Sequence, residues 1–283
     1  MREEARRRRK NSKSRRLLVR TLVVALVVLV GGSVYFVTHR NKLIAESYGR
    51  AESFLLKGNY EAAATTFHGL YQHHPNSRQA PQALLQAADI HNLYQSRYQQ
   101  ALLDYLLVER DYPESPQASK AERQIAQIYK YRLRDYPQAI FAYQKLLDQG
   151  QADSDAIQYE VADSYFQLNN FEQARIEFEN LLKSYPHSKL VPKVLYRIAV
   201  MSSLVGQPRA AEDEFRKVIK KFPGDRYALE SRFSLAGVLE DQEQLGEALK
   251  ILEALKGVYP DKDALKRRIE QLKKRISKKG EGF

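Results

Sequence analysis

The chain has 283 residues, of which 43% are hydrophobic and 28% are charged, and these proportions exclude a wholly disordered chain because a sizeable core can be buried. It contains no cysteine, which excludes disulfides, thiolate metal sites and cysteine nucleophiles. The formal net charge of +12 arises at the two ends, so the intervening residues 21–261 are close to neutral.

The first part of the chain combines a basic segment with an apolar one. Residues 1–20 carry ten basic and two acidic side chains, and residues 1–16 are predicted to form a basic cytoplasmic N-terminus. Residues 17–38 are predicted to form a transmembrane signal anchor, because Arg20 is the only charged residue in Leu17–Val37. A helix over this stretch would be about 32 Å long, which matches one hydrocarbon core.

Two other interpretations of this segment fit the sequence less well. A cleaved signal peptide has a shorter apolar stretch followed by small residues, whereas this stretch runs into Tyr35, Phe36 and Val37. A lipoprotein anchor requires a cysteine. By the positive-inside rule, the N-terminus is expected in the cytoplasm and the chain beyond about residue 40 outside it. The sequence therefore predicts a single-pass inner-membrane protein with a periplasmic or other extracytoplasmic domain.

The basic ends indicate contacts with lipid rather than with nucleic acid. Residues 17–38 are expected to contact the bilayer, and anionic lipid is a candidate partner of both basic ends. The run Arg6–Lys10 could also be a nucleic-acid arm, but its position beside a membrane helix favours a role in topology. No nucleic acid is therefore expected, and the default interpretation of the basic residues 262–283 is a solvated helix face.

A regular series of prolines and alanines predicts repeats over residues 39–262. Five prolines are separated by 37 or 38 residues, with one double step. An alanine stands twelve residues before each proline, a sixth alanine fills the gap, and a large apolar side chain follows each alanine by four residues. These offsets lie on one helix face, so the alanines are assigned to close helix–helix packing. The packing alanines are Ala63, Ala101, Ala139, Ala174, Ala211 and Ala248.

Each alanine-bearing helix is predicted to be the second of a pair. Small residues such as Ala162 and Ala199 mark the first helix, and repeats two and three are expected to place one additional residue in the intervening turn. Proline ends each pair because it cannot continue a helix. Four residues follow a proline by two positions and are predicted to cap the next helix: Ser77, Ser115, Ser188 and Asp225.

The predicted fold class is all-α, with about six helix pairs of about 37 residues each stacked into a solenoid after the single transmembrane helix. One such pair cannot bury its apolar face alone, so stacking provides a continuous core. Residues 263–283 are predicted to form a basic C-terminal capping helix and tail, with Leu265, Ile269 and Leu272 at helical spacing.

The order of small residue, Tyr, Ala, Phe and Pro resembles the tetratricopeptide repeat (TPR), most clearly in residues 162–186, ADSYFQLNNFEQARIEFENLLKSYP. The resemblance covers about residues 45–262 and implies a right-handed superhelix whose first helices line a protein-binding groove. The Tyr-Pro-x-Ser joins at Tyr112 and Tyr185 are similar to those of the BamD/YfiO-like and YbgF/CpoB-like TPR domains of the bacterial envelope. The membrane anchor is similar to that of the YfgM-like family.

The resemblance implies that residues on the first helix of each pair face proteins or peptides. Aromatic side chains among charged ones suit peptide capture, because rigid aromatic area supplies much of the binding energy. Tyr159→Ala is accordingly expected to weaken binding and to leave thermal stability almost unchanged, whereas a large loss of stability would identify a core residue. The predicted concave-face residues are Tyr48, Glu52, Asp89, Asn92, Arg123, Lys130, Tyr131, Tyr159, Asp163, Phe166, Tyr196, Phe233 and Glu240.

No motif in the sequence indicates catalysis or a cofactor. The chain has no glycine-rich phosphate loop, no His-Glu-x-x-His and no nucleophile-elbow motif. His68, His73 and His74 lie near one helix end, at a spacing that favours surface histidines over a metal site. The protein is therefore expected not to be an enzyme and to bind neither cofactor nor metal.

The predicted function is a membrane-anchored TPR scaffold or adaptor that binds protein partners in cell-envelope biogenesis, such as secretion, outer-membrane assembly or division. The anchor would raise the effective concentration towards any membrane-bound partner. The alternative is a structural subunit of a pilus or secretion complex. One constant partner in a fixed ratio would indicate the subunit, and several substoichiometric partners the adaptor.

Overall fold

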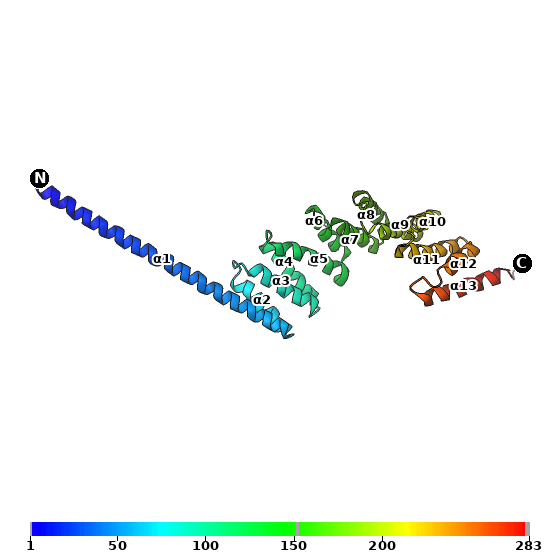
Figure 1. Ribbon diagram of the computed structural model, residues 1–283, viewed down its shortest axis with the longest axis horizontal. Helices are drawn as coiled ribbons and strands as arrows, with labels where there is room; N and C mark the ends of the chain where they lie inside the picture. Colours follow the sequence, from blue (N-terminus) through cyan, green and yellow to red (C-terminus); the bar gives the residue numbers. More distant parts are fainter. Residues whose placement is uncertain (1, 151–152, 281–283) are drawn as a thin grey trace. The chain divides into compact units, whose positions relative to one another are not determined.

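The computed structural model describes residues 2–150 and 153–280, with side chains from residue 26 onward. Every regular element in these residues is a helix (Figure 1). The first helix, α1 (Arg2–Leu56), is 55 residues long, and shorter helices follow it. These are α2 (Tyr60–His73), α3 (Ala80–Leu93), α4 (Tyr98–Asp111), α5 (Pro116–Gln127), the π-helix η1 (Ile128–Leu133), α6 (Tyr136–Asp148), α7 (Ser154–Gln167), α8 (Phe171–Ser184), α9 (Val191–Leu204), α10 (Pro208–Lys221), α11 (Arg226–Asp241), α12 (Leu245–Ala254) and α13 (Lys262–Gly280).

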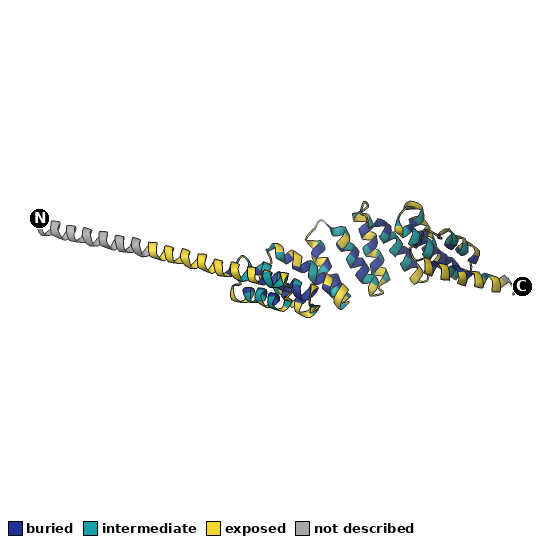
Figure 2. Ribbon diagram, turned by 60° about the horizontal axis from the view of Figure 1, so that its bottom comes forward, coloured by how far each residue is buried: buried dark blue, intermediate teal, exposed yellow. Residues whose placement is uncertain are grey.

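The packing alanines lie where neighbouring helices touch, and all six have 0% of their surface exposed. Four residues further on, large side chains fill the space beside the alanine: Phe67, Tyr105, Phe178 and Phe215 are at most 1% exposed. Figure 2 shows buried positions on the helix faces that meet one another and exposed positions on the outer faces. The small alanine side chain allows the helices to approach closely, and the aromatic ring fills the remaining volume.

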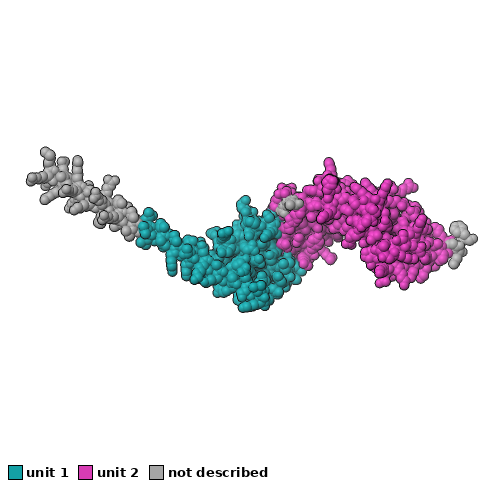
Figure 3. All heavy atoms as spheres, viewed as in Figure 1, with its two compact units in different colours: residues 1–122 teal, residues 123–283 magenta. Residues whose placement is uncertain are grey.

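The helices form two compact units, residues 1–122 and 123–283 (Figure 3). In the first unit, α1 packs against α2, α2 against α3, and α3 against α4. In the second unit, α6 packs against η1 and α7, and α7 to α13 continue this series, with α9 also contacting α11. Each unit is therefore a stack of helix pairs.

For the third repeat, the prediction that the additional residue lies in the turn between the two helices is wrong. The residue is accommodated inside the first helix of the pair, where Ile128–Leu133 is π-helical. The i→i+5 hydrogen bonds of a π-helix absorb an insertion without interrupting the helix. Arg134 then ends the helix in the left-handed conformation, at φ 54°. In the second repeat the additional residue does lie in the turn, where Ser96 also has φ 54°.

The capping residues after the prolines follow the prediction in part. The Asp225 side chain accepts a hydrogen bond from the backbone N–H of Tyr227, and the Ser115 hydroxyl accepts one from Ala118. Ser77 does not cap a helix, because α3 begins only at Ala80. Its buried hydroxyl has no hydrogen-bond partner among the described residues.

The predicted membrane segment comprises residues 17–38, and the structure describes side chains only from residue 26 onward. Residues 17–25 of the segment therefore lie outside the described side chains. Within the part of the chain whose side chains are described, no helix combines the length and the apolar character needed to cross a membrane. The predicted cytoplasmic residues 1–16 also lie outside the described side chains.

The last helix, α13, covers the end of the second unit. Leu265, Ile269 and Leu272 are at most 5% exposed and pack into the core formed with α11 and α12. The opposite face of α13 is basic. Residues 281–283 of the predicted tail lie outside the described residues.

Candidate functional site

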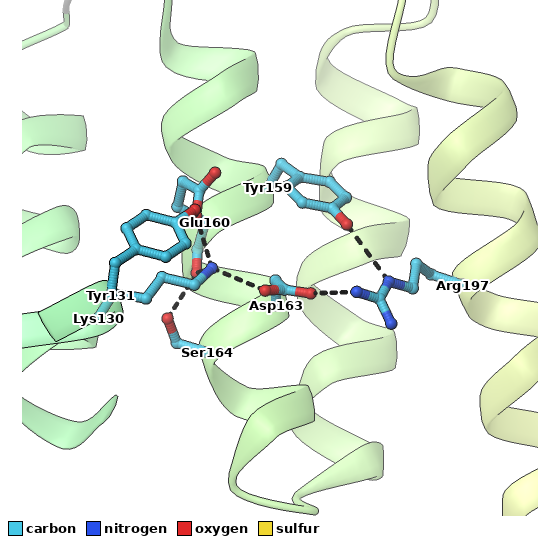
Figure 4. Close-up of polar contacts among 7 residues, drawn as sticks. All are labelled: Lys130, Tyr131, Tyr159, Glu160, Asp163, Ser164 and Arg197. Atoms are coloured by element: carbon cyan, nitrogen blue, oxygen red, sulfur yellow. Dashed lines mark hydrogen bonds and ion pairs between the residues drawn. The ribbon is translucent and has the colours of Figure 1, made fainter. Parts of the chain in front are cut away.

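A group of polar and aromatic side chains joins three successive first helices of the second unit (Figure 4). In the tetratricopeptide repeats that the sequence resembles, first helices line the concave side of the stack, and solenoid proteins bind their partners on such surfaces. The members come from η1, α7 and α9 and are connected by hydrogen bonds and ion pairs. We call them the polar cluster, which consists of Lys130, Tyr131, Tyr159, Glu160, Asp163 and Arg197.

Lys130 is the centre of the polar cluster. Its side chain is 2% exposed, and its Nζ lies 2.5 Å from Glu160 Oε2 and 2.8 Å from Asp163 Oδ2. It also donates a hydrogen bond of 3.2 Å to the backbone oxygen of Glu160. The ammonium group therefore has an acceptor for each of its three protons, which compensates for its burial. The π-helical turn around Lys130 shifts the residues relative to α-helical spacing and accounts for its inward position.

Asp163 bridges Lys130 and Arg197. Its Oδ1 lies 2.8 Å from Arg197 Nη2, while its Oδ2 contacts Lys130. Arg197 Nε donates a hydrogen bond of 3.3 Å to the hydroxyl of Tyr159, and the guanidinium lies 4.7 Å from the ring centroid of Phe166. Burial raises the pKa of the Tyr159 phenol to about 12, so the hydroxyl stays protonated at neutral pH. These contacts hold the guanidinium and the Phe166 ring in one arrangement.

Two side chains at the polar cluster remain available to a partner. Tyr131 is 57% exposed, although its hydroxyl donates a hydrogen bond to Glu160. Lys193 of α9 has its Nζ 3.8 Å from the ring centroid of Tyr159 and forms no ion pair with any described residue. Burial lowers the pKa of the Lys193 ammonium. Together with Lys193, the polar cluster has three cations and two carboxylates, so it can accept one further anionic group.

Comparison with known families identifies the repeat. Two family models, both described as tetratricopeptide repeat, match residues 47–77 in the first unit and residues 128–189 in the second. The chain contains tetratricopeptide repeats. The second match contains η1 and α7, so most of the polar cluster belongs to recognisable TPR sequence.

Solved TPR structures share the fold at low sequence identity. A TPR protein from Parabacteroides merdae is 16% identical, with a TM-score of 0.52 over 81% of this chain and 98% of its own. PilW, described as a widely conserved type IV pilus biogenesis factor, is 14% identical, with a TM-score of 0.52 over 80% of this chain and 98% of its own. YrrB, described as a TPR protein with an unusual peptide-binding site, is 15% identical, with a TM-score of 0.50 over 74% of this chain and all of its own. No curated protein matches the chain.

Five of the predicted concave-face residues come together in the TPR structure. Lys130, Tyr131, Tyr159 and Asp163 are members of the polar cluster, and Phe166 lies beside it. The prediction that all of them line an open groove is wrong, because Lys130, Tyr159 and Asp163 are only 3%, 4% and 8% exposed. The first helix of a TPR pair packs against neighbouring helices on both sides, so positions directed at those neighbours are buried.

The other predicted residues of the second unit lie outside the polar cluster. Arg123 Nη1 lies 2.7 Å from Asp153 Oδ2, and Tyr196 packs against aromatic rings of α10 and α11. Phe233 and Glu240 on α11 are joined through Arg268, whose guanidinium lies over the Phe233 ring and whose Nε is 2.9 Å from Glu240 Oε1. Phe233 and Glu240 therefore connect α11 to α13.

The predicted residues of the first unit are dispersed. Tyr48 packs edge-on against a buried phenylalanine, and Glu52 is exposed. Asp89 accepts a hydrogen bond from the hydroxyl of Tyr105. Asn92 is 6% exposed, so the prediction that it lines an open groove is also wrong, because its position faces the interior of the TPR stack.

Three charged residues of the site are missing from the sequence-based prediction, namely Glu160, Lys193 and Arg197. A signal for one of them is present in the sequence. Lys130, Asp163 and Arg197 are 33 and 34 residues apart, so charges of opposite sign alternate at nearly the TPR period. Side chains one repeat apart are neighbours in a TPR stack. Asp163 can therefore form ion pairs with Lys130 of the preceding repeat and with Arg197 of the following one.

His73 is exposed and His74 is the C-cap of α2, as predicted, whereas His68 and His91 lie beside a buried carboxylate. His91 Nδ1 lies 2.8 Å from Oδ2 of the fully buried Asp104, and His68 Nδ1 lies 3.5 Å from its other oxygen. Across residues 26–150 and 153–280, no group of three or more histidine, aspartate or glutamate side chains is arranged to hold a metal ion.

Tyr159→Ala is expected to lower the melting temperature, in contrast to the expectation from the sequence. The Tyr159 ring is buried against Phe178, with ring centroids 5.5 Å apart, and truncating a buried aromatic residue typically costs about 3–5 kcal/mol. Tyr159→Phe retains the ring and removes only the contact with Arg197, so it should keep most of the stability. Thermal unfolding followed by circular dichroism compares the two variants, and equal losses would assign the stabilisation to the hydroxyl instead.

Proposed function

We propose that this TPR protein is a membrane-anchored, non-enzymatic scaffold that binds protein partners on the extracytoplasmic side in cell-envelope biogenesis. The observation that carries the proposal is the polar cluster, in which the Tyr131 ring is exposed and the Tyr159 ring lies against Lys193, a cation without an ion pair to any described residue. An extended partner segment would place a carboxylate on Lys193 and an apolar side chain against the Tyr131 ring. Aromatic anchors of this type supply a large share of the energy in protein–protein contacts.

The buried ion pairs support binding because they fix the surface before a partner arrives. Glu160 holds Tyr131, and Arg197 holds Phe166, while both charged residues are tied to the Lys130–Asp163 pair. Ordering a flexible side chain on binding costs about 0.5–1.5 kcal/mol, and this cost is smaller for side chains that are already held. A partner carboxylate would also compensate Lys193 for its partial burial.

The proposed anchor is residues 17–38. Leu29 and Tyr35, in the described half of this segment, are 69% and 71% exposed, and a continuous apolar surface of this kind favours apolar surroundings. The hydroxyl of Thr38 donates a hydrogen bond of 2.9 Å to the backbone oxygen of Val34, so this polar group is satisfied without water. Both features support insertion into a bilayer.

A photoreactive residue at position 131 tests the partner site in intact membranes. We expect an adduct of defined mass from position 131 and none from position 141, because Phe141 is 68% exposed on α6, a second helix that does not line the concave face. Lys193→Glu should reduce the adduct at least tenfold, since it would repel a carboxylate. Equal adducts from positions 131 and 141 would contradict the proposed site.

Single-cysteine variants test the proposed topology, because the chain has no cysteine of its own. Ser184→Cys, at the exposed end of α8, should react with a membrane-impermeant maleimide once the outer membrane has been permeabilised. Ser14→Cys should react only after cell lysis, and the chain should stay in the membrane fraction after washing with carbonate. Recovery of a soluble, N-terminally trimmed chain would rule out the anchor.

The alternative function is a structural subunit of a pilus or secretion complex. The likeness of the fold to PilW, a type IV pilus biogenesis factor, is the observation that favours it. The stoichiometry of the adduct from position 131 distinguishes the two functions. A single partner in a fixed ratio supports the subunit, and several substoichiometric partners support the scaffold.

A further inference from the structure

Two grooves near the end of the second unit have apolar floors and basic rims. The first has a volume of about 610 Å³, lies between α10 and α12, and has Leu235 of α11 in its floor. The second has a volume of about 460 Å³, lies between α13 and the residues that follow α12, and has Leu265 and Ile269 in its floor. We call these the basic grooves. They are formed by α10 to α13, whereas the polar cluster lies on η1, α7 and α9.

The rims of the basic grooves carry eight cations and two carboxylates. Some of the cations are neutralised internally, since Arg216 Nη2 lies 2.6 Å from Glu247 Oε1 and Lys273 Nζ lies 2.9 Å from Glu253 Oε1. Five rim cations form no ion pair with any described residue: Lys220, Arg232, Lys250, Lys262 and Lys266. In the first groove this excess is local, because residues 21–261, which contain that groove, are close to neutral as a whole.

We infer that the basic grooves form a second binding surface, which takes an acidic amphipathic segment of a partner protein. The unpaired cations match carboxylates on one side of such a segment, and the floors match its apolar side chains. Charge complementarity of this kind directs the partner and sets its orientation. The surface is independent of the polar cluster because the two share no residue.

The shape of the second groove favours a protein segment over a lipid. Lys262, Lys266 and Lys273 are spaced by four and seven residues, so they form a stripe along α13 of roughly 16 Å, in which Lys262 and Lys266 have no ion pair and Lys273 is shared with Glu253. A stripe can pair with successive carboxylates of a segment lying along the helix, whereas one headgroup needs cations that converge on a single phosphate.

Fluorescence anisotropy with the full-length chain in detergent micelles tests this inference. The probe is a labelled amphipathic peptide with leucines on one helical face and glutamates on the other, and the control peptide has lysine in place of each glutamate. We expect the acidic peptide to bind, the basic peptide not to bind, and binding to weaken as salt is added. Lys250→Glu/Lys266→Glu should weaken binding at least tenfold.

A matched variant separates the basic grooves from a general effect of charge. Lys183→Glu/Lys189→Glu changes two exposed lysines at the end of α8 and beyond, with the same change in net charge, and should alter binding less than twofold. Equal weakening by both double variants would overturn the inference.

Two further outcomes would also overturn it. If Lys193→Glu abolishes binding and Lys250→Glu/Lys266→Glu does not, the probe occupies the polar cluster instead. If the chain binds vesicles of phosphatidylglycerol through Lys250 and Lys266 but not the acidic peptide, the occupant is a lipid surface. Circular dichroism of each variant confirms that it is folded.

Discussion

Lys130→Ala is expected to lower the free energy of unfolding of the second unit by about 3–5 kcal/mol, the usual effect of removing one partner from a buried ion pair. The substitution leaves Glu160 and Asp163 without the ammonium group that they share in the interior. Asp163 keeps its contact with Arg197, but Glu160 keeps only the hydroxyl of Tyr131. Urea unfolding followed by circular dichroism measures the loss.

A pair of variants tests whether the uncompensated charge causes this loss. Lys130→Met replaces the ammonium with an apolar group of similar length and should be strongly destabilising by itself. Lys130→Met/Glu160→Gln removes the repulsion between the two remaining carboxylates and should recover part of the stability. If the double variant is no more stable than Lys130→Met, the packing of the lysine side chain, and not its charge, provides the stabilisation.

Phe178→Ala is expected to cost about 3–5 kcal/mol, because Phe178 is fully buried between α8 and its neighbours. The ring packs beside Ala174 and against Tyr159, so its removal leaves a cavity that the rigid helix crossing cannot close. The midpoint and slope of urea unfolding measure the change.

Phe141 provides the matched control for this prediction. It is also a phenylalanine on a second helix, α6, but it is 68% exposed. Phe141→Ala should therefore change the stability by no more than about 0.5 kcal/mol. If Phe141→Ala and Phe178→Ala lowered the free energy of unfolding by similar amounts, the burial of the phenylalanine ring would not determine its contribution to stability.

The helix pairs could be predicted from the sequence because two simple rules act together in each repeat. Ala174 and Phe178 illustrate them, since an alanine permits the close crossing and an aromatic residue one turn later fills the space beside it. Proline at positions such as Pro186 then prevents the helix from continuing. These constraints are local and recur at a fixed period, so they can be recognised without any knowledge of tertiary contacts.

The candidate site could be predicted only in part, because its register depends on tertiary contacts. Every residue of Ile128–Leu133 is compatible with an α-helix, so nothing in that segment indicates that it takes up the additional residue as a π-turn. Lys130 therefore has the sequence signature of an exposed lysine, and only the carboxylates of α7 allow it to be buried. Tyr159 has the same ambiguity, since an aromatic residue at helical spacing suits both a groove and a core.

The continuity of α1 has a mechanical consequence for the proposed anchor. The helix passes from the apolar stretch to Ala51 in the core of the first TPR pair without a break, so no hinge separates the two parts. If the part of α1 embedded in the bilayer tilted or rotated, the first helix pair would move with it as a rigid body. Each residue inserted near position 40 would rotate that pair by about 100° about the helix axis. The orientation of the first TPR pair relative to the membrane would thus depend on helix phase rather than on a flexible tether.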